Sequence, residues 1–92
     1  MVIALDYDNT YTADPLLCDG FIVVSQARGH SVMVATMRSQ SEGKIVEVDL
    51  LGKVDDIIFT DRKAKRPYLK KSGIFPDVWI DDIPEFISTD AV

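Results

Sequence analysis

The sequence predicts an α/β fold: a three-layer, Rossmann-like domain with a short parallel sheet, spanning residues 1–92 as one domain. Three observations support this prediction. Four short apolar runs recur along the chain, helical patterns lie between them, and polar residues directly follow each run. Apolar runs without alternation are typical of strands covered on both faces. Alternating strands and helices are typical of a parallel sheet with right-handed crossovers.

The predicted strands are the four apolar runs, namely Val2–Leu5, Val32–Ala35, Ile57–Phe59 and Val78–Ile80. The first helix is expected to begin with Asp14 as its N-cap and Pro15 at its first position, and to end at Gly29. Its apolar face is expected to consist of the residues that recur at helical spacing, which are Leu17, Phe21, Val24 and Ala27.

Two further helices and a last turn follow. The second helix is expected to start near Ser41 and stop at Gly52, with one apolar face formed by Ile45, Val48 and Leu51. The third is expected over Pro67–Lys71 and ends at Gly73. A last turn is predicted to begin at Pro84.

Composition limits the class of protein. The chain has 92 residues, of which 47% are hydrophobic, and one cysteine, Cys18, so no internal disulfide can form. No apolar run approaches the about 20 residues of a membrane span. The first residues, MVIALD, do not resemble a secretory leader, so we expect a cytoplasmic protein with no membrane partner.

Charge is unevenly distributed. The net charge is −5, yet residues 62–71 (RKAKRPYLKK) contain six of the ten basic groups and no acid. The remaining chain carries four bases against 15 acids, which argues against a general nucleic-acid binder. The basic segment either attracts a phosphorylated ligand or is a solvated helix face.

Polar residues follow each predicted strand. Asp6 and Asp8 follow the first, Thr36 and Arg38 the second, Thr60 and Asp61 the third, and Asp81 and Asp82 the fourth. In open parallel sheets, ligands bind beyond the carboxyl ends of the strands, so these groups should meet at one edge. Clustered carboxylates without Cys or His suit a hard cation such as Mg²⁺, and nearby lysines suit a phosphoryl group.

These segments resemble the motifs of the haloacid dehalogenase (HAD) superfamily. VIALDYDNT resembles its first motif, VMVAT its second, a lysine of the basic segment its third and VWIDD its fourth, in the family's order over residues 2–82. Response-regulator receivers use similar residue types on a similar sheet, but their phosphorylated aspartate follows the third strand. The order of the motifs therefore favours an HAD-like fold.

The resemblance implies a role for each motif residue. Asp6 would be the nucleophile that forms an aspartyl-phosphate, and Asp8 the general acid and base. Thr36 would donate its hydroxyl to a phosphoryl oxygen. Lys65 is favoured over Lys63 as the motif lysine.

The resemblance also implies a metal and a substrate site. Mg²⁺ would be held by the Asp6 carboxylate, the Asp8 backbone carbonyl and the paired acids, with Asp82 favoured over Asp81 as the direct ligand. The candidate substrate-binding residues are Asn9, Thr10, Arg38 and Lys63. Arg38 either joins Thr36 at the phosphoryl group or is simply exposed.

The chain departs from the family in lacking room for a cap domain. The Asp8–Thr36 and Thr36–Lys65 segments hold little more than one helix each, so we expect a small capless core with an open site. The expected strand order is 3-2-1-4. Because this order leaves the fourth strand at an edge, a homodimer across Val78–Ile80 is a further expectation.

Three functions stay open at this point. The first is a Mg²⁺-dependent phosphomonoester hydrolase that acts on a small or macromolecular phosphorylated substrate. The second is a regulatory protein that binds phosphate and Mg²⁺ with little turnover. The third is a phosphatase of nucleic-acid ends, for which the open site and the basic segment are the motivation.

Overall fold

A computed structural model describes all 92 residues. Four parallel strands form one sheet in the order β3-β2-β1-β4, as predicted. The strands are β1 (Val2–Leu5), β2 (Ser31–Thr36), β3 (Asp56–Phe59) and β4 (Val78–Ile80). The arrangement is a Rossmann-like α/β fold, in which β1 and β2 lie at the centre and β4 lies at an edge.

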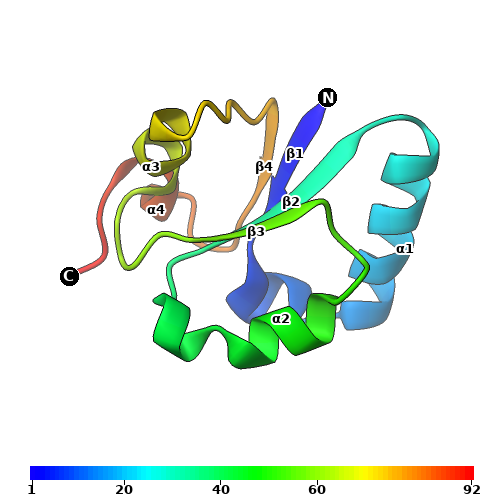
Figure 1. The fold of residues 1–92 in the computed structure, drawn as a ribbon, viewed down its shortest axis with the longest axis horizontal. Coiled ribbons are helices and arrows are strands. Elements are labelled where there is room, and N and C mark those ends of the chain that lie inside the picture. Colours follow the sequence, from blue (N-terminus) through cyan, green and yellow to red (C-terminus); the bar gives the residue numbers. More distant parts are fainter.

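Helices cover both faces of the sheet. On one face lie α1 (Pro15–Ala27) and α2 (Lys44–Leu50), and on the other lie α3 (Lys65–Lys71) and the short α4 (Glu85–Ser88), as Figure 1 shows. Irregular turns over Tyr7–Tyr11 and Gln40–Glu42 connect β1 to α1 and β2 to α2. No helix combines the length and the apolar composition that a membrane crossing requires.

Each face of the sheet has its own hydrophobic cluster. In β1, Ile3 and Leu5 point into the larger cluster with α1 and α2, whereas Ala4 points into the smaller one with Leu69 of α3. Successive side chains of a strand point to opposite faces. A strand covered on both faces therefore needs a continuous apolar run, which explains why the runs show no alternation.

The predicted apolar face of α1 is wrong. The Asp14 cap is confirmed, because its carboxylate accepts a hydrogen bond from the Leu17 amide at 3.1 Å. The buried residues are Ile22 and Ser25, however, while Leu17, Phe21 and Val24 face solvent. Apolar residues occur on two opposite sides of this helix, so spacing alone does not identify the side that packs on the sheet.

The same correction applies to α2, and a smaller one to α3. Val46 and Leu50 of α2 are buried, and the residues predicted to be inside are exposed, namely Ile45, Val48 and Leu51. Helix α3 begins at Lys65, two residues before the predicted start at Pro67. A proline is tolerated there because amides of the first helical turn have no partner within the helix.

Candidate functional site

A cleft lies at the edge of the sheet where the strands end. Ten residues line it. Seven of them are predicted site residues, namely Asp6, Asp8, Asn9, Thr36, Lys65, Asp81 and Asp82. The other three are Met37, Ile83 and Phe86. The cleft encloses about 130 Å³. Sites that bury a drug-sized ligand enclose about 300–1,000 Å³. The cleft therefore has room for a group of phosphoryl size, and the remainder of a larger ligand would lie outside.

The centre of the cleft is a buried ion triad. The Lys65 side chain is 2% exposed, and its Nζ donates to Asp6 Oδ1 at 2.8 Å and to Asp81 Oδ2 at 2.6 Å. Asp6 follows β1, Lys65 begins α3 and Asp81 follows β4, so three separate elements meet here. The triad carries one uncompensated negative charge, and buried charge of this kind is costly without a counterion.

The Asp6 carboxyl shows the effect of this imbalance. Burial raises its pKa to about 6 from an ordinary value of 3.8, and the ammonium of Lys65 opposes that rise only in part. The neighbouring acids Asp82 and Asp81 raise the pKa further. A cation placed beside these acids would favour the carboxylate form.

Thr10 connects Asp6 to Asp82, the second acid of the pair that follows β4. Its Oγ1 lies 3.1 Å from Asp6 Oδ2 and 3.1 Å from Asp82 Oδ1, and it accepts a hydrogen bond from the Asp82 amide at 3.2 Å. One hydroxyl has one proton, so Thr10 can donate to only one of the two carboxylates at a time. Sequence reasoning placed Thr10 among the substrate contacts, whereas here it bridges two acids.

The donor set of the cleft fits a hard divalent cation. Carboxylate oxygens of Asp6, Asp81 and Asp82 lie within 4.8 Å of one another. Asp81 is largely committed, because Lys65 occupies one of its oxygens and the Ile83 amide donates to the other at 3.0 Å. Asp82 is exposed and keeps free acceptor positions. All the available ligands are oxygens, as Mg²⁺ prefers, and Asp82 is the better placed of the pair.

Asp8 reaches the cleft by a turn of the backbone. β1 ends at Leu5, and the chain passes through extended dihedrals at Asp8 (φ −65°, ψ 127°) to a left-handed conformation at Asn9 (φ 60°). Asparagine tolerates this conformation better than most residues. The turn brings the Asp8 side chain over the end of β2, where Arg38 lies.

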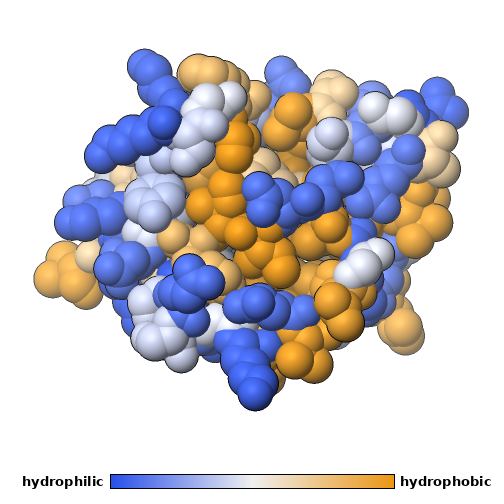
Figure 2. Space-filling view, in the orientation of Figure 1, coloured by the Kyte–Doolittle hydropathy of each residue, from blue (hydrophilic) through white to orange (hydrophobic).

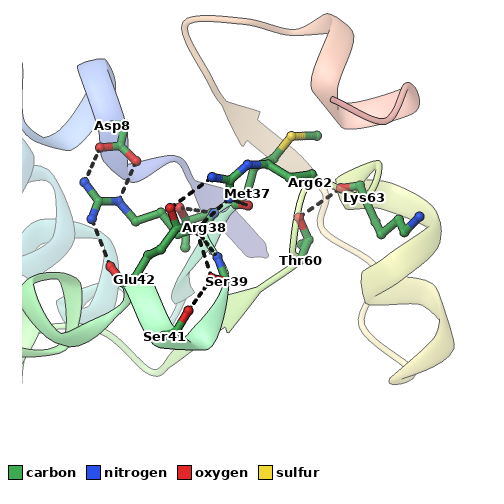
Figure 3. A network of polar contacts seen from close by, with 10 residues as sticks. Asp8, Met37, Arg38, Ser39, Ser41, Glu42, Thr60, Arg62 and Lys63 are labelled. Atoms are coloured by element: carbon green, nitrogen blue, oxygen red, sulfur yellow. Dashed lines mark hydrogen bonds and ion pairs between the residues drawn. The ribbon is translucent and has the colours of Figure 1, made fainter. Parts of the chain in front are cut away.

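Arg38 holds the Asp8 carboxylate with two parallel hydrogen bonds, visible in Figure 3. Arg38 Nε donates to Asp8 Oδ2 at 2.9 Å, and Arg38 NH2 donates to Oδ1 at 2.8 Å. These bonds lower the pKa of Asp8 below its ordinary value. The carboxylate is therefore held deprotonated, a state suited to accepting a proton.

A second ion pair, between Glu42 and Arg62, lies next to Arg38 and helps to position it. Glu42 accepts two hydrogen bonds from the Arg62 guanidinium, at 2.7 and 3.0 Å, while its carbonyl accepts one from Arg38 NH1 at 2.9 Å (Figure 3). The bonds from Arg62 hold the pKa of Glu42 down at about 2. Arg62 has a left-handed backbone (φ 67°) and donates to the Met37 carbonyl. Sequence reasoning missed this support because nothing in the sequence pairs positions 42 and 62.

The two candidate lysines lie in different places. Lys65 is in the triad, whereas the Lys63 side chain points away from the polar network in Figure 3 and borders a separate depression with Tyr68 and Lys71. The Lys63 carbonyl accepts a hydrogen bond from Thr60 Oγ1 at 2.9 Å, which shapes the turn before α3. Thr36 is 1% exposed and lines the cleft at the end of β2.

Sequence reasoning also missed the apolar rim. Met37, Ile83 and Phe86 line the cleft beside the polar groups. Met37 directly follows Thr36 and Ile83 directly follows Asp82, both predicted site residues. This position in the sequence could have indicated that the two side chains lie near the cleft. Phe86 lies on α4, and no pattern in the sequence points it toward the cleft.

Comparison with known proteins adds no further evidence: no protein family, curated protein or solved structure matches the chain.

Proposed function

We propose that this protein is a Mg²⁺-dependent phosphomonoester hydrolase of the HAD type, which acts through an aspartyl-phosphate on Asp6. One observation carries the proposal. The buried Asp6 carboxylate lies against the Lys65 ammonium and beside two further acids, at the edge of a parallel sheet where ligands bind. This combination offers a nucleophile, fixed positive charge and oxygen ligands in one cleft.

In the first step, an Asp6 carboxylate oxygen attacks phosphorus. Oδ1 is held by Lys65, and Oδ2 becomes the freer oxygen whenever Thr10 donates to Asp82 instead. A bond forms between Asp6 and phosphorus, and the bond from phosphorus to the ester oxygen breaks. Asp8 must first take up a proton, against the effect of its two hydrogen bonds from Arg38, and it then gives this proton to the ester oxygen, which leaves as an alcohol.

In the second step, the Asp8 carboxylate takes a proton from a water that attacks phosphorus. The bond between phosphorus and Asp6 breaks and inorganic phosphate leaves. Asp6 is then a carboxylate again, and Asp8 carries the proton that the next first step needs. Arg38 supports this step, since it favours the deprotonated form of Asp8. The Thr36 hydroxyl and the Lys65 ammonium would hold the phosphoryl oxygens.

Mg²⁺, held by Asp6, the Asp8 carbonyl and Asp82, would supply positive charge that offsets the phosphoryl oxyanions. The protein's own residues position the reacting groups. The small, open cleft suits substrates whose phosphate enters while the remainder stays outside.

The test is hydrolysis of p-nitrophenyl phosphate, a nucleotide panel and a 5′-phosphorylated oligonucleotide, with Mg²⁺ and with chelator. We expect turnover that requires Mg²⁺ and falls at least about 10⁴-fold in Asp6→Asn, since the variant lacks the nucleophile. The matched control is Asp56→Asn, an exposed aspartate at the opposite end of its strand, which should retain activity. Turnover that survives Asp6→Asn or ignores the chelator would overturn the mechanism.

One observation favours a second function, a regulatory protein that binds phosphate and Mg²⁺ without turnover. Arg38 engages both oxygens of Asp8, the residue that must carry a proton in the first step. If this pair persists when ligand binds, the first step lacks its acid. Calorimetric binding of Mg²⁺ and of vanadate, combined with no hydrolysis across the panel, would support this alternative, and robust hydrolysis would reject it.

A further inference from the structure

The outer face of α1 is a hydrophobic surface without a single charged side chain. It is called here the α1 stripe and comprises Leu16, Leu17, Gly20, Val23, Val24 and Ala27, all of which are exposed. Leu16 is 84% exposed and Leu17 is 68% exposed. Figure 2 shows hydrophobic side chains at the surface along the edge where Figure 1 places α1. A solvated helix normally carries polar residues on its outer face, so this face has the character of an interface.

The two ends of the stripe carry opposite charges. Asp14 lies just before α1 and Arg28 just after it, and neither forms an ion pair within the chain. They are separated by about four helical turns, which places them on the same flank of the helix. The midpoint between them is Phe21, beside Gly20. An antiparallel pair of α1 helices with its twofold axis at this midpoint would set Asp14 of each copy against Arg28 of the other.

The centre of the stripe allows close approach. A Cβ atom added at Gly20 would meet no atom within 4 Å, so no part of the chain covers this point. Helices pack at axial distances of about 8–10 Å, and small residues at the crossing permit the shorter values. The twofold axis passes near this open position.

The apolar area is large enough for the centre of a dimer interface, but not for all of it. The large side chains of the stripe, which are 60% to 84% exposed, offer roughly 450 Å², within the range of the largest apolar patch on a typical monomer. Val23 and Gly52 border one depression, and Leu51 beside Gly52 is 83% exposed. Asp19, Gln26 and Lys53 also line this depression, so a polar rim would supply the remainder of the about 800 Å² that each partner buries in a standard interface.

We propose that the α1 stripe is the interface of a symmetric homodimer, in which the α1 helices of two copies pack antiparallel. The apolar stripe is then covered, and its oppositely charged ends pair with those of the second copy. No residue that lines the functional cleft belongs to α1, so both clefts stay open to substrate. This interface differs from a pairing of β4 edges and does not depend on the proposed hydrolase activity.

The first experiment is sedimentation equilibrium of the full chain over a wide concentration range. We expect a monomer–dimer equilibrium whose dissociation constant rises at least about tenfold in Val24→Glu. Ile45→Glu is the matched control, because Ile45 is similarly exposed (55% against 60%) on the outer face of α2. A monomer at every concentration would overturn the proposal, and so would a dimer that Val24→Glu leaves intact, the result expected for pairing through β4.

Two further variants test the antiparallel arrangement. Arg28→Glu should weaken the dimer by repulsion from Asp14 of the second copy, whereas Arg28→Lys should preserve it. In a Cys18→Ser background, Gly20→Cys should form an intermolecular disulfide on mild oxidation. Ala27→Cys should not, because six residues from the axis place the two thiols roughly 18 Å apart along the helices, beyond the about 7 Å between Cα atoms that a disulfide allows. Cross-linking of Ala27→Cys in place of Gly20→Cys would reject this arrangement.

Discussion

The functional cleft and the outer face of α1 depart from the usual distribution of polar and apolar groups in opposite directions. At the end of the sheet, the chain buries an ammonium and two carboxylates, with Lys65 only 2% exposed. On α1, it exposes leucine and valine, with Leu16 84% exposed. Buried charge and exposed hydrocarbon are both unfavourable in an isolated chain.

The comparison shows that the two departures are compensated differently. In the cleft, most of the compensation comes from within the chain. Lys65 pairs with Asp6 and Asp81, and its positive charge neutralises one of their two negative charges. On α1, nothing in the chain covers the stripe, so any compensation comes from another molecule. We therefore expect the cleft to respond to substitution and to cations in the monomer, and the stripe to respond only to association.

The largest effect on stability is expected for Lys65→Met. Removal of the ammonium leaves Asp6 and Asp81 buried as two adjacent carboxylates, and loss of one partner from a buried pair costs about 3–5 kcal/mol. Denaturant unfolding of the metal-free protein measures the loss. Lys63→Met is the matched control: Lys63 is exposed and should change stability by no more than about 0.5 kcal/mol. Equal effects of the two variants would show that the triad does not stabilise the fold.

The next effect distinguishes the two sides of α1. Ile22 is 1% exposed and lies in the larger hydrophobic cluster, so Ile22→Ala should cost about 2–5 kcal/mol. Val24 is 60% exposed, and Val24→Ala should cost less than about 0.5 kcal/mol in dilute, monomeric protein. The measurement is chemical denaturation at low concentration. A larger loss at Val24 than at Ile22 would mean that the inner and outer faces are assigned the wrong way round.

The two sides of α1 also show how far the sequence alone could predict this structure. The four strands and the N-cap at Asp14 follow from local signals: short apolar runs, turn residues and capping chemistry. The order of the strands does not follow from such signals, and is expected instead from the resemblance of the motifs to a known family. The buried side of α1 does not follow from them either, because Leu17 and Val24 satisfy helical spacing as well as Ile22 does. Only the three-dimensional packing on the sheet, with the small Ser25 turned inward beside Ile22, distinguishes the two.

The candidate site could be predicted to a similar degree. The position of Asp6, Thr36 and Asp82 at the ends of strands follows from the parallel sheet, since all carboxyl ends meet at one edge. The contacts among the side chains do not follow, because they depend on turns without a sequence period. The bidentate pair of Arg38 with Asp8 and the support of Arg62 by Glu42 are examples.

The pH dependence of stability tests the uncompensated charge of the cleft. The pKa of Asp6 is raised from 3.8 to about 6 in the folded protein, so the folded state binds more protons than the unfolded state between these values. The free energy of unfolding therefore decreases as the pH rises from 3.8 to about 6. At 1.36 kcal/mol per pKa unit, Asp6 alone accounts for a decrease of about 3 kcal/mol. Urea unfolding gives the free energy of unfolding of the wild type and of Asp6→Asn at each pH. The difference between the two separates the contribution of Asp6 from that of the other acids.

Mg²⁺ should reverse this dependence. A cation beside Asp6 favours the carboxylate, so stabilisation by Mg²⁺ should grow as pH rises through about 6 and should be small in Asp6→Asn. Thermal unfolding with and without Mg²⁺ at each pH provides the measurement. Stabilisation of the same size in Asp6→Asn would place the cation elsewhere.

The smallest effect concerns Tyr7, which joins the turn beside the cleft to the helical layer. Its hydroxyl donates to Asp49 Oδ2 at 2.5 Å, and burial raises its pKa from 10.0 to about 12. Tyr7→Phe should cost about 1 kcal/mol at neutral pH, the usual net value of one hydrogen bond. Because the folded pKa is raised, the stability that Tyr7 contributes is present below pH 10 and lost between 10 and 12, so this alkaline loss should be smaller in the variant. Denaturant unfolding of the wild type and of Tyr7→Phe at stepped pH values between about 9 and 12 measures the difference, and an equal alkaline loss in both proteins would contradict the prediction.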